Sequence, residues 1–141
     1  MARTVRKLKS LPKPAGFAED AQPFLHDDIV RGVPAKRVQE LIDRGVLSQK
    51  AVYRAISERT FKRRLANRDV LKAPEADAIA RLLRVTEAAR RAFGEEDFAR
   101  KWLNLPVPSL NGAIPIELAE TDAGAREVEA ALGRFMHGII S

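Results

Sequence analysis

The 141-residue sequence contains no cysteine and only two histidines, His26 and His137. The absence of cysteine excludes a disulfide scaffold and Cys-ligated zinc, and it is compatible with a reducing cytoplasm. The histidines lie far apart in sequence without a carboxylate at metal-ligand spacing, so each is interpreted as structural. A nucleophile elbow, a glycine-rich phosphate loop and a zinc signature are also missing. We therefore expect a protein that is not an enzyme and that uses no cofactor or metal.

Long apolar runs are missing as well. No segment approaches the roughly 20 apolar residues that a membrane span needs, and the basic start of the chain is not followed by the apolar region of a signal peptide. Hydrophobic residues nevertheless make up 45% of the chain, which is enough for a core. We expect a soluble cytoplasmic protein that forms one domain, or two small ones sharing a core.

The net charge of +6 is unevenly distributed along the chain. Residues 1–72 contain 17 Lys and Arg against 8 Asp and Glu, a balance of +9, whereas residues 73–141 carry a balance of −3. Excess basic residues can serve solubility alone, but this asymmetry favours a polyanionic partner for the front of the chain. The mildly acidic back suits a partner of a different kind.

Residues 1–24 are basic and contain three prolines, which oppose a continuous helix. They are interpreted as a flexible tail, either without a specific use or as an arm that contacts phosphates.

Residues 25–72 have the pattern of several short helices. Ser48 and Ser57 are placed to cap two of them, and the second helix would bury Phe61 and Leu65 on one face. A Ser-capped helix that follows a short helix and a tight turn has the arrangement of a DNA recognition helix, although a solvated basic face is the alternative. The candidate DNA-binding residues combine base readers and phosphate contacts: Ser57, Arg59, Thr60, Lys62, Arg63, Arg64, Asn67 and Arg68.

Residues 73–94 predict a long helix that begins near Pro74 and ends at Gly94. Its apolar surface is too wide for one neighbour, so we expect it to be a spine with a module on each side, or part of a homodimer seam. Its arginines, Arg81, Arg84, Arg90 and Arg91, are expected on a solvated face.

Residues 95–141 predict a helical C-terminal module. Phe98, Trp102 and Leu103 would form the apolar face of its first helix, with Trp102 either in the core or at a partner contact. Asn111-Gly112 favours a turn, Thr121 caps the last helix, and Gly138 ends it. Apolar residues beyond a helix end are unusual. Ile139 and Ile140 would either fold back on the core or dock, with Ser141, into a pocket of a partner.

Two stretches resemble a known family. Ile56-Ser-Glu-Arg-Thr-Phe-Lys-Arg-Arg-Leu65 is similar to the pattern I-S-x-R-T-x-x-R-R-L. The second stretch begins at Ala92-Phe-Gly94 and continues through Trp102-Leu103, Pro108-Ser-Leu-Asn-Gly-Ala-Ile-Pro-Ile-Glu-Leu118 and Thr121-Asp-Ala-Gly124. The chain is thereby identified as similar to the Xre-type antitoxins of bacterial RES–Xre toxin–antitoxin modules, the Xre/MbcA/ParS-like group. Ala119 departs from the pattern, which commonly has Leu there.

The resemblance implies an all-α fold in which a Cro/repressor-like helix-turn-helix domain precedes a helical toxin-binding domain at residues 95–141. It implies a homodimer that neutralises a RES-domain, NAD-consuming toxin by covering its active site, and that represses its own operon by binding operator DNA. The implied toxin-binding residues lie in the C-terminal module: Trp102, Leu110, Met136, His137, Gly138, Ile139, Ile140 and Ser141. The alternative is a stand-alone transcriptional regulator whose C-terminal module only dimerises.

Overall fold

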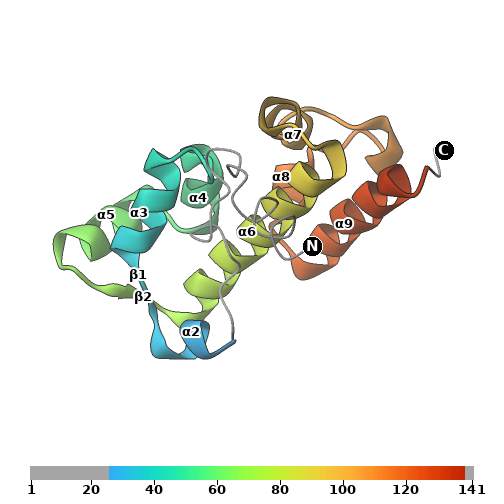
Figure 1. The fold of residues 1–141 in the computed structure, drawn as a ribbon. Coiled ribbons are helices and arrows are strands. Elements are labelled where there is room, and N and C mark those ends of the chain that lie inside the picture. Colours follow the sequence, from blue (N-terminus) through green and yellow to red (C-terminus); the bar gives the residue numbers. More distant parts are fainter. Residues whose placement is uncertain (1–25, 139–141) are drawn as a thin grey trace, which may run out of the picture.

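A long helix, α6 (Ala73–Phe93), carries a helical module at each end (Figure 1). Pro74 occupies its first turn, where a missing N–H costs no hydrogen bond, and Glu75 accepts a hydrogen bond from the backbone N–H of Lys72 at 2.8 Å. Gly94 ends the helix in the left-handed conformation, with φ 69°. The predicted limits of this helix are confirmed.

The structure, a computed structural model, describes residues 26–138. The predicted N-terminal tail therefore lies outside the described residues, as do Ile139, Ile140 and Ser141.

The N-terminal module combines short helices with one small sheet. Its helices are α2 (His26–Arg31), α3 (Ala35–Asp43), α4 (Gln49–Ala55) and α5 (Glu58–Ala66). Strands β1 (Val33–Pro34) and β2 (Val70–Leu71) pair antiparallel, with Val33 opposite Leu71. The sequence pattern predicts the helices but not these two-residue strands, which join the start of the module to its end.

The core of this module surrounds Phe61, which is fully buried. Val38 of α3 and Val52 of α4 are equally buried, and Ile79 and Leu83 of α6 complete the same cluster. The first half of α6 is thus an integral part of the N-terminal module.

The C-terminal module contains α7 (Glu96–Leu103), the 3₁₀ turn η2 (Pro108–Leu110), α8 (Pro115–Leu118) and α9 (Asp122–Met136). Helices α7 and α9 both pack along α6, and Figure 1 shows them around its far end. Their core includes Val85 and Ala89 of α6, together with Leu103, Val128 and Leu132. Because α6 contributes to both cores, the prediction that it is a spine between two modules is confirmed.

Close backbone approach explains one glycine in the C-terminal module. A Cβ atom added to Gly124 would lie only 1.8 Å from the carbonyl oxygen of Leu118. Thr121 also accepts a hydrogen bond from the N–H of Gly124 at 3.0 Å, as the predicted cap of α9. The Thr121–Gly124 spacing therefore lets the start of α9 sit directly against α8.

Arginine side chains join the two modules across α6. Arg81 donates hydrogen bonds to the carbonyl oxygens of Ala119 (3.2 Å) and Glu120 (2.9 Å). Arg54 of α4 forms ion pairs with Glu117 and Glu120 at 3.2 and 2.6 Å. The expectation that Arg81 lies on a solvated face is wrong, because its side chain is only 15% exposed and binds the α8–α9 loop.

Candidate functional site

Helix α5 is held in place by its N-terminal cap and its buried face. Ser57 accepts a hydrogen bond from the N–H of Thr60 at 3.2 Å and donates one from its hydroxyl to Thr60 Oγ1 at 2.8 Å. Phe61 faces the core, and Leu65 is partly buried. The prediction that Ser57 caps this helix is confirmed. Because Phe61 and Leu65 face the core, the opposite face of α5 lies in solvent.

The exposed face of α5 is basic. Arg59, Lys62 and Arg63 are separated by three and four residues, which places them on one side of the helix, and all three are exposed. Lys62 pairs with Glu58 at 2.7 Å, and this hydrogen bond raises the pKa of Lys62 above its ordinary value. These three side chains form a cationic strip on the solvent-exposed side of α5.

The strip continues past the end of α5. Asn67 caps the C-terminus of the helix and Arg68 follows in the left-handed conformation, with φ 52°. Both residues are exposed. Their side chains therefore extend the polar surface of α5 toward the turn before β2.

Arg64 differs from the other predicted DNA-binding residues. Its side chain is 10% exposed and forms an ion pair with Glu75, with Nε 2.9 Å from Oε1. This Nε contact lacks hydrogen-bond geometry, but Nη2 donates a hydrogen bond to Glu75 Oε2 at 3.2 Å. Asp69 lies 3.6 Å from Nη1. Unlike the exposed candidates, Arg64 thus links α5 to α6 inside the module, and a DNA contact through its side chain stays a prediction.

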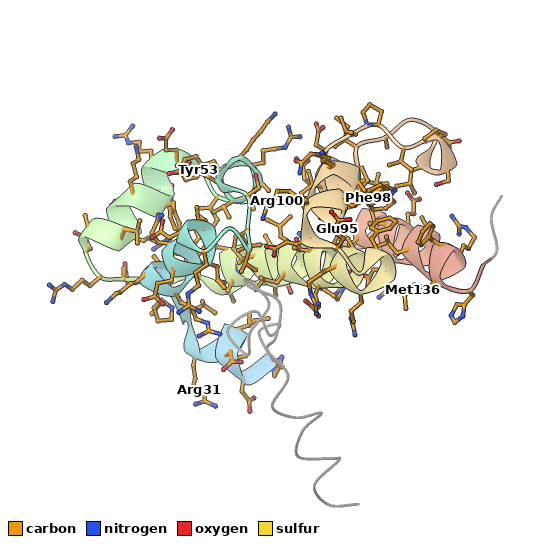
Figure 2. All side chains as sticks on the ribbon, turned by 45° about the horizontal axis from the view of Figure 1, so that its top comes forward. Arg31, Tyr53, Glu95, Phe98, Arg100 and Met136 are labelled. Atoms are coloured by element: carbon orange, nitrogen blue, oxygen red, sulfur yellow. The ribbon has the colours of Figure 1, made fainter. Side chains whose placement is uncertain are left out.

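Four aromatic side chains meet at the far end of the C-terminal module. The ring of Phe93 lies 4.9 Å from that of Phe98, 5.4 Å from that of Trp102 and 4.8 Å from that of Phe135, measured between centroids. Phe98 and Phe135 are 51% and 52% exposed. We call these four residues the aromatic patch; Figure 2 shows Phe98 on this end, with Met136, and Tyr53 on the other module.

The predicted toxin-binding residues are only partly brought together. Trp102 belongs to the aromatic patch but is partly buried against the core of the C-terminal module. Leu110 is 8% exposed and belongs to the same core, so the structure places it away from the exposed toxin-binding candidates. Met136, 56% exposed, and His137 lie at the exposed end of α9, and Gly138 follows them with φ 71°.

The residue pattern does not identify Phe98 and Phe135 as surface residues. Both follow apolar helical spacing, which predicts that they face the core. Spacing selects one face of a helix, but it does not tell whether a neighbouring element covers the end of that face. Here both rings pack against Phe93, the last residue of α6, and part of each ring stays in solvent.

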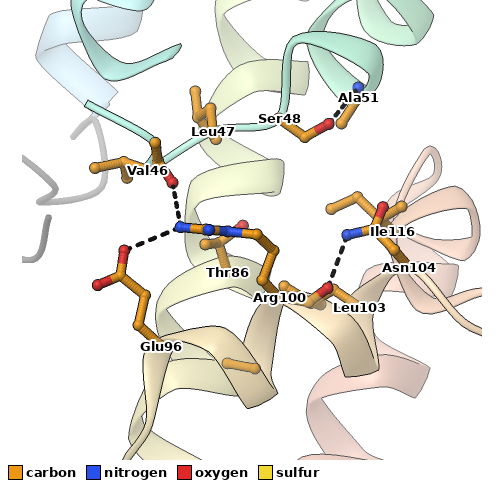
Figure 3. Close-up of a pocket in the computed structure, with 12 residues that line it drawn as sticks. Val46, Leu47, Ser48, Ala51, Thr86, Glu96, Arg100, Leu103, Asn104 and Ile116 are labelled. Atoms are coloured by element: carbon orange, nitrogen blue, oxygen red, sulfur yellow. Dashed lines mark hydrogen bonds and ion pairs between the residues drawn. The ribbon is translucent and has the colours of Figure 1, made fainter. Parts of the chain in front are cut away.

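A cavity of about 440 Å³ lies between the α3–α4 loop and α7 (Figure 3). Arg100 spans it, donating hydrogen bonds to the carbonyl oxygen of Gly45 and to Glu96, both at 3.2 Å. Most other lining side chains are apolar or small, including Val46, Leu103 and Ile116. The guanidinium of Arg100 is already paired, and the lining residues offer no set of reactive groups. We interpret this cavity as a gap where the two modules adjoin.

Within residues 26–138, no three His, Asp or Glu side chains are grouped so that they could hold a metal ion. In the same part of the chain, none of the helices has the length and apolar character of a membrane span.

Comparisons with known proteins match both modules. Residues 24–85 match the family described as the antitoxin Xre-like helix-turn-helix domain. Residues 88–138 match the family described as the antitoxin Xre/MbcA/ParS C-terminal toxin-binding domain. The boundary between the two matches falls inside α6, as expected for a helix that belongs to both cores.

Curated relatives extend over both modules. Antitoxin Xre of Photorhabdus laumondii is 29% identical over 140 residues, which cover 96% of this chain and 95% of the relative. Antitoxin Xre of Pseudomonas putida is 31% identical over 114 residues, covering 81% and 72%. The Prs ADP-ribosylating antitoxin of a Sphingobium strain is 27% identical over 121 residues, covering 78% and 76%. The chain belongs to the Xre antitoxin family.

Proposed function

We propose that this antitoxin neutralises a RES-domain toxin by covering its active site with the C-terminal module. The observation that carries the proposal is the exposed end of α9, where Met136 and His137 lead out of the module that matches a toxin-binding domain. The same module offers apolar surface, and its described residues include no group of His, Asp and Glu side chains that could hold a metal ion. Such a surface can obstruct a cleft without taking part in the chemistry.

A deletion of the C-terminal tail, residues 138–141, tests this proposal. Deleting residues 138–141 removes the helix-ending glycine and everything beyond it but leaves the core of the module intact. We expect the truncated chain to keep the melting temperature of the full chain within a few degrees while losing most of its inhibition of NAD consumption by the toxin. Full inhibition by the truncated chain would exclude an inserted tail.

We further propose that the N-terminal module binds operator DNA and represses the operon of the antitoxin. The cationic strip on α5 supports this proposal, since Arg commonly reads guanine and Lys contacts phosphate. Replacing Arg59 and Arg63 with Ala should weaken operator binding by about 1–3 kcal/mol for each arginine that reads a base. A gel-shift titration measures this change, and unaltered affinity would move the DNA-binding surface away from α5.

We also propose that the antitoxin works as a homodimer within a larger complex with its toxin. Two copies would place two α5 helices on adjacent DNA half-sites, as the symmetry of helix-turn-helix operators requires. Light scattering of the free chain and of the complex measures both stoichiometries.

A stand-alone regulator, whose C-terminal module only dimerises, is the competing function. It predicts that the chain does not co-purify with the product of its neighbouring gene.

A further inference from the structure

The aromatic patch is an exposed apolar surface of the C-terminal module, and the proposed binding of DNA by the N-terminal module does not explain it. Phe98 and Phe135 are both about half exposed, and each lies in ring contact with Phe93 beneath them. Apolar side chains gathered on the surface of a soluble protein mark interaction sites, and aromatic residues are enriched among the residues that carry most of the binding energy. A partly supported ring also loses little freedom on binding, because its neighbours already hold it.

We propose that the aromatic patch anchors the toxin. This inference rests on the proposed function. The patch lies wholly within residues 88–138, the part that matches a toxin-binding domain. Phe135 precedes Gly138 by three residues, so the aromatic patch lies beside the exposed C-terminal end of α9. A partner that covers this end of the module therefore meets the patch.

The charge around the patch distinguishes the toxin from a second copy of this chain. Glu95 is exposed, and Figure 2 shows it beside Phe98; Asp97, also exposed, lies 3.9 Å from Arg100 on the same helix. In a two-fold contact the same surface is present on both sides, so a self-associating patch would place both copies of Glu95 in one interface. A partner with an apolar pocket and a basic rim avoids this repulsion. The partner surface is accordingly predicted to be apolar at its centre and basic at its edge.

Anchor and tail should be separable in measurement. Removing an anchoring aromatic ring should weaken binding about 30-fold, mainly through faster dissociation. At antitoxin concentrations well above the weakened dissociation constant, such a variant should still inhibit fully because its tail is intact. Deleting residues 138–141 should have the opposite effect, with binding largely retained and inhibition abolished.

The experiment measures surface plasmon resonance of the full-length chain on an immobilised, catalytically inactive RES-domain toxin encoded beside its gene. Phe98→Ala and Phe135→Ala are the test variants. Val30→Ala is the control, because Val30 is 66% exposed on α2 of the other module. We expect both test variants to dissociate about 30-fold faster, and the control to match the wild type.

Unchanged dissociation of both aromatic variants would overturn the anchor. A change in oligomeric state on light scattering, with toxin affinity unaltered, would overturn it in favour of self-association. Failure of the wild-type chain to bind would instead refute the proposed function. Circular dichroism checks that both variants fold. Because the two rings lie on separate helices, either variant alone can test the anchor if the other does not fold. Glu95→Lys tests the rim without touching the rings, and it should slow association; unchanged association would contradict the predicted basic rim.

Discussion

Replacing Arg64 with Ala tests whether this arginine is structural, in contrast to its neighbour Arg63. The substitution leaves the Glu75 carboxylate, 20% exposed, without the guanidinium that lies 2.9 Å away. Removing one partner of a buried ion pair costs about 3–5 kcal/mol. Both side chains are partly exposed, so solvent screens part of this ion-pair energy. We therefore expect a loss of about 2–3 kcal/mol in the free energy of unfolding.

Thermal unfolding followed by circular dichroism is the assay. A chain of this size shifts its melting temperature by about 3–4 °C for each kcal/mol, so Arg64→Ala should melt roughly 6–12 °C lower than the wild type. Arg63→Ala is the matched control, because Arg63 is exposed on the same helix. It should change the free energy of unfolding by no more than about 0.5 kcal/mol, while weakening operator binding.

If the Arg64→Ala chain had the same melting temperature as the wild type, the structural role of the ion pair would be refuted. If that chain also bound operator DNA less tightly, Arg64 would belong with the cationic strip after all. If Arg63→Ala lowered the melting temperature as much as Arg64→Ala, the distinction between the two arginines would be wrong.

Three other substitutions test the local structure. Gly124→Ala would force a Cβ atom into the Leu118 carbonyl, so we expect a loss of at least about 3 kcal/mol in chemical denaturation; a loss below about 1 kcal/mol would contradict the close approach. A hydrogen bond from Arg84 lowers the pKa of Asp122, so the stabilisation by this carboxylate is present above its ordinary pKa and is lost as the pH falls through the lowered value. Asp122→Asn should therefore flatten the decline in melting temperature below about pH 4, and an unchanged decline would argue against the ion pair. Ser57→Ala removes the cap of α5 and should cost about 1 kcal/mol, measured in the same denaturation experiment.

Capping residues made much of the helical framework predictable from sequence. Ser48, Ser57 and Thr121 each accept the hydrogen bond that their position predicts. These signals are local, because a short polar side chain can satisfy a free N–H at a helix start wherever the helix later packs. Gly94 ends α6 for a similarly local reason, since glycine adopts a left-handed conformation easily.

The features that the sequence pattern does not predict involve residues whose environment depends on distant parts of the chain. Arg64 resembles its exposed neighbours until α6 brings Glu75 against it. Arg81 looks like a solvated arginine until the α8–α9 loop brings two carbonyl oxygens to its guanidinium. Strands β1 and β2 contain two residues each, too few to show any periodicity.

Exposure at the end of the C-terminal module was equally inaccessible to the sequence pattern. Phe98 and Phe135 have the spacing of core residues, but the structure shows that they pack against Phe93 at the end of α6 and that the described chain leaves about half of each side chain exposed. The aromatic patch is consequently a result of the structure, whereas the basic face of α5 is already evident in the sequence.

Titrating the full-length antitoxin into the active RES-domain toxin, while following NAD consumption, tests the central claim most directly. If the C-terminal module covers the active site, NAD consumption should fall to background at a fixed molar ratio of antitoxin to toxin. Continued NAD consumption by a toxin that is saturated with bound antitoxin would contradict the claim that this module obstructs the active site.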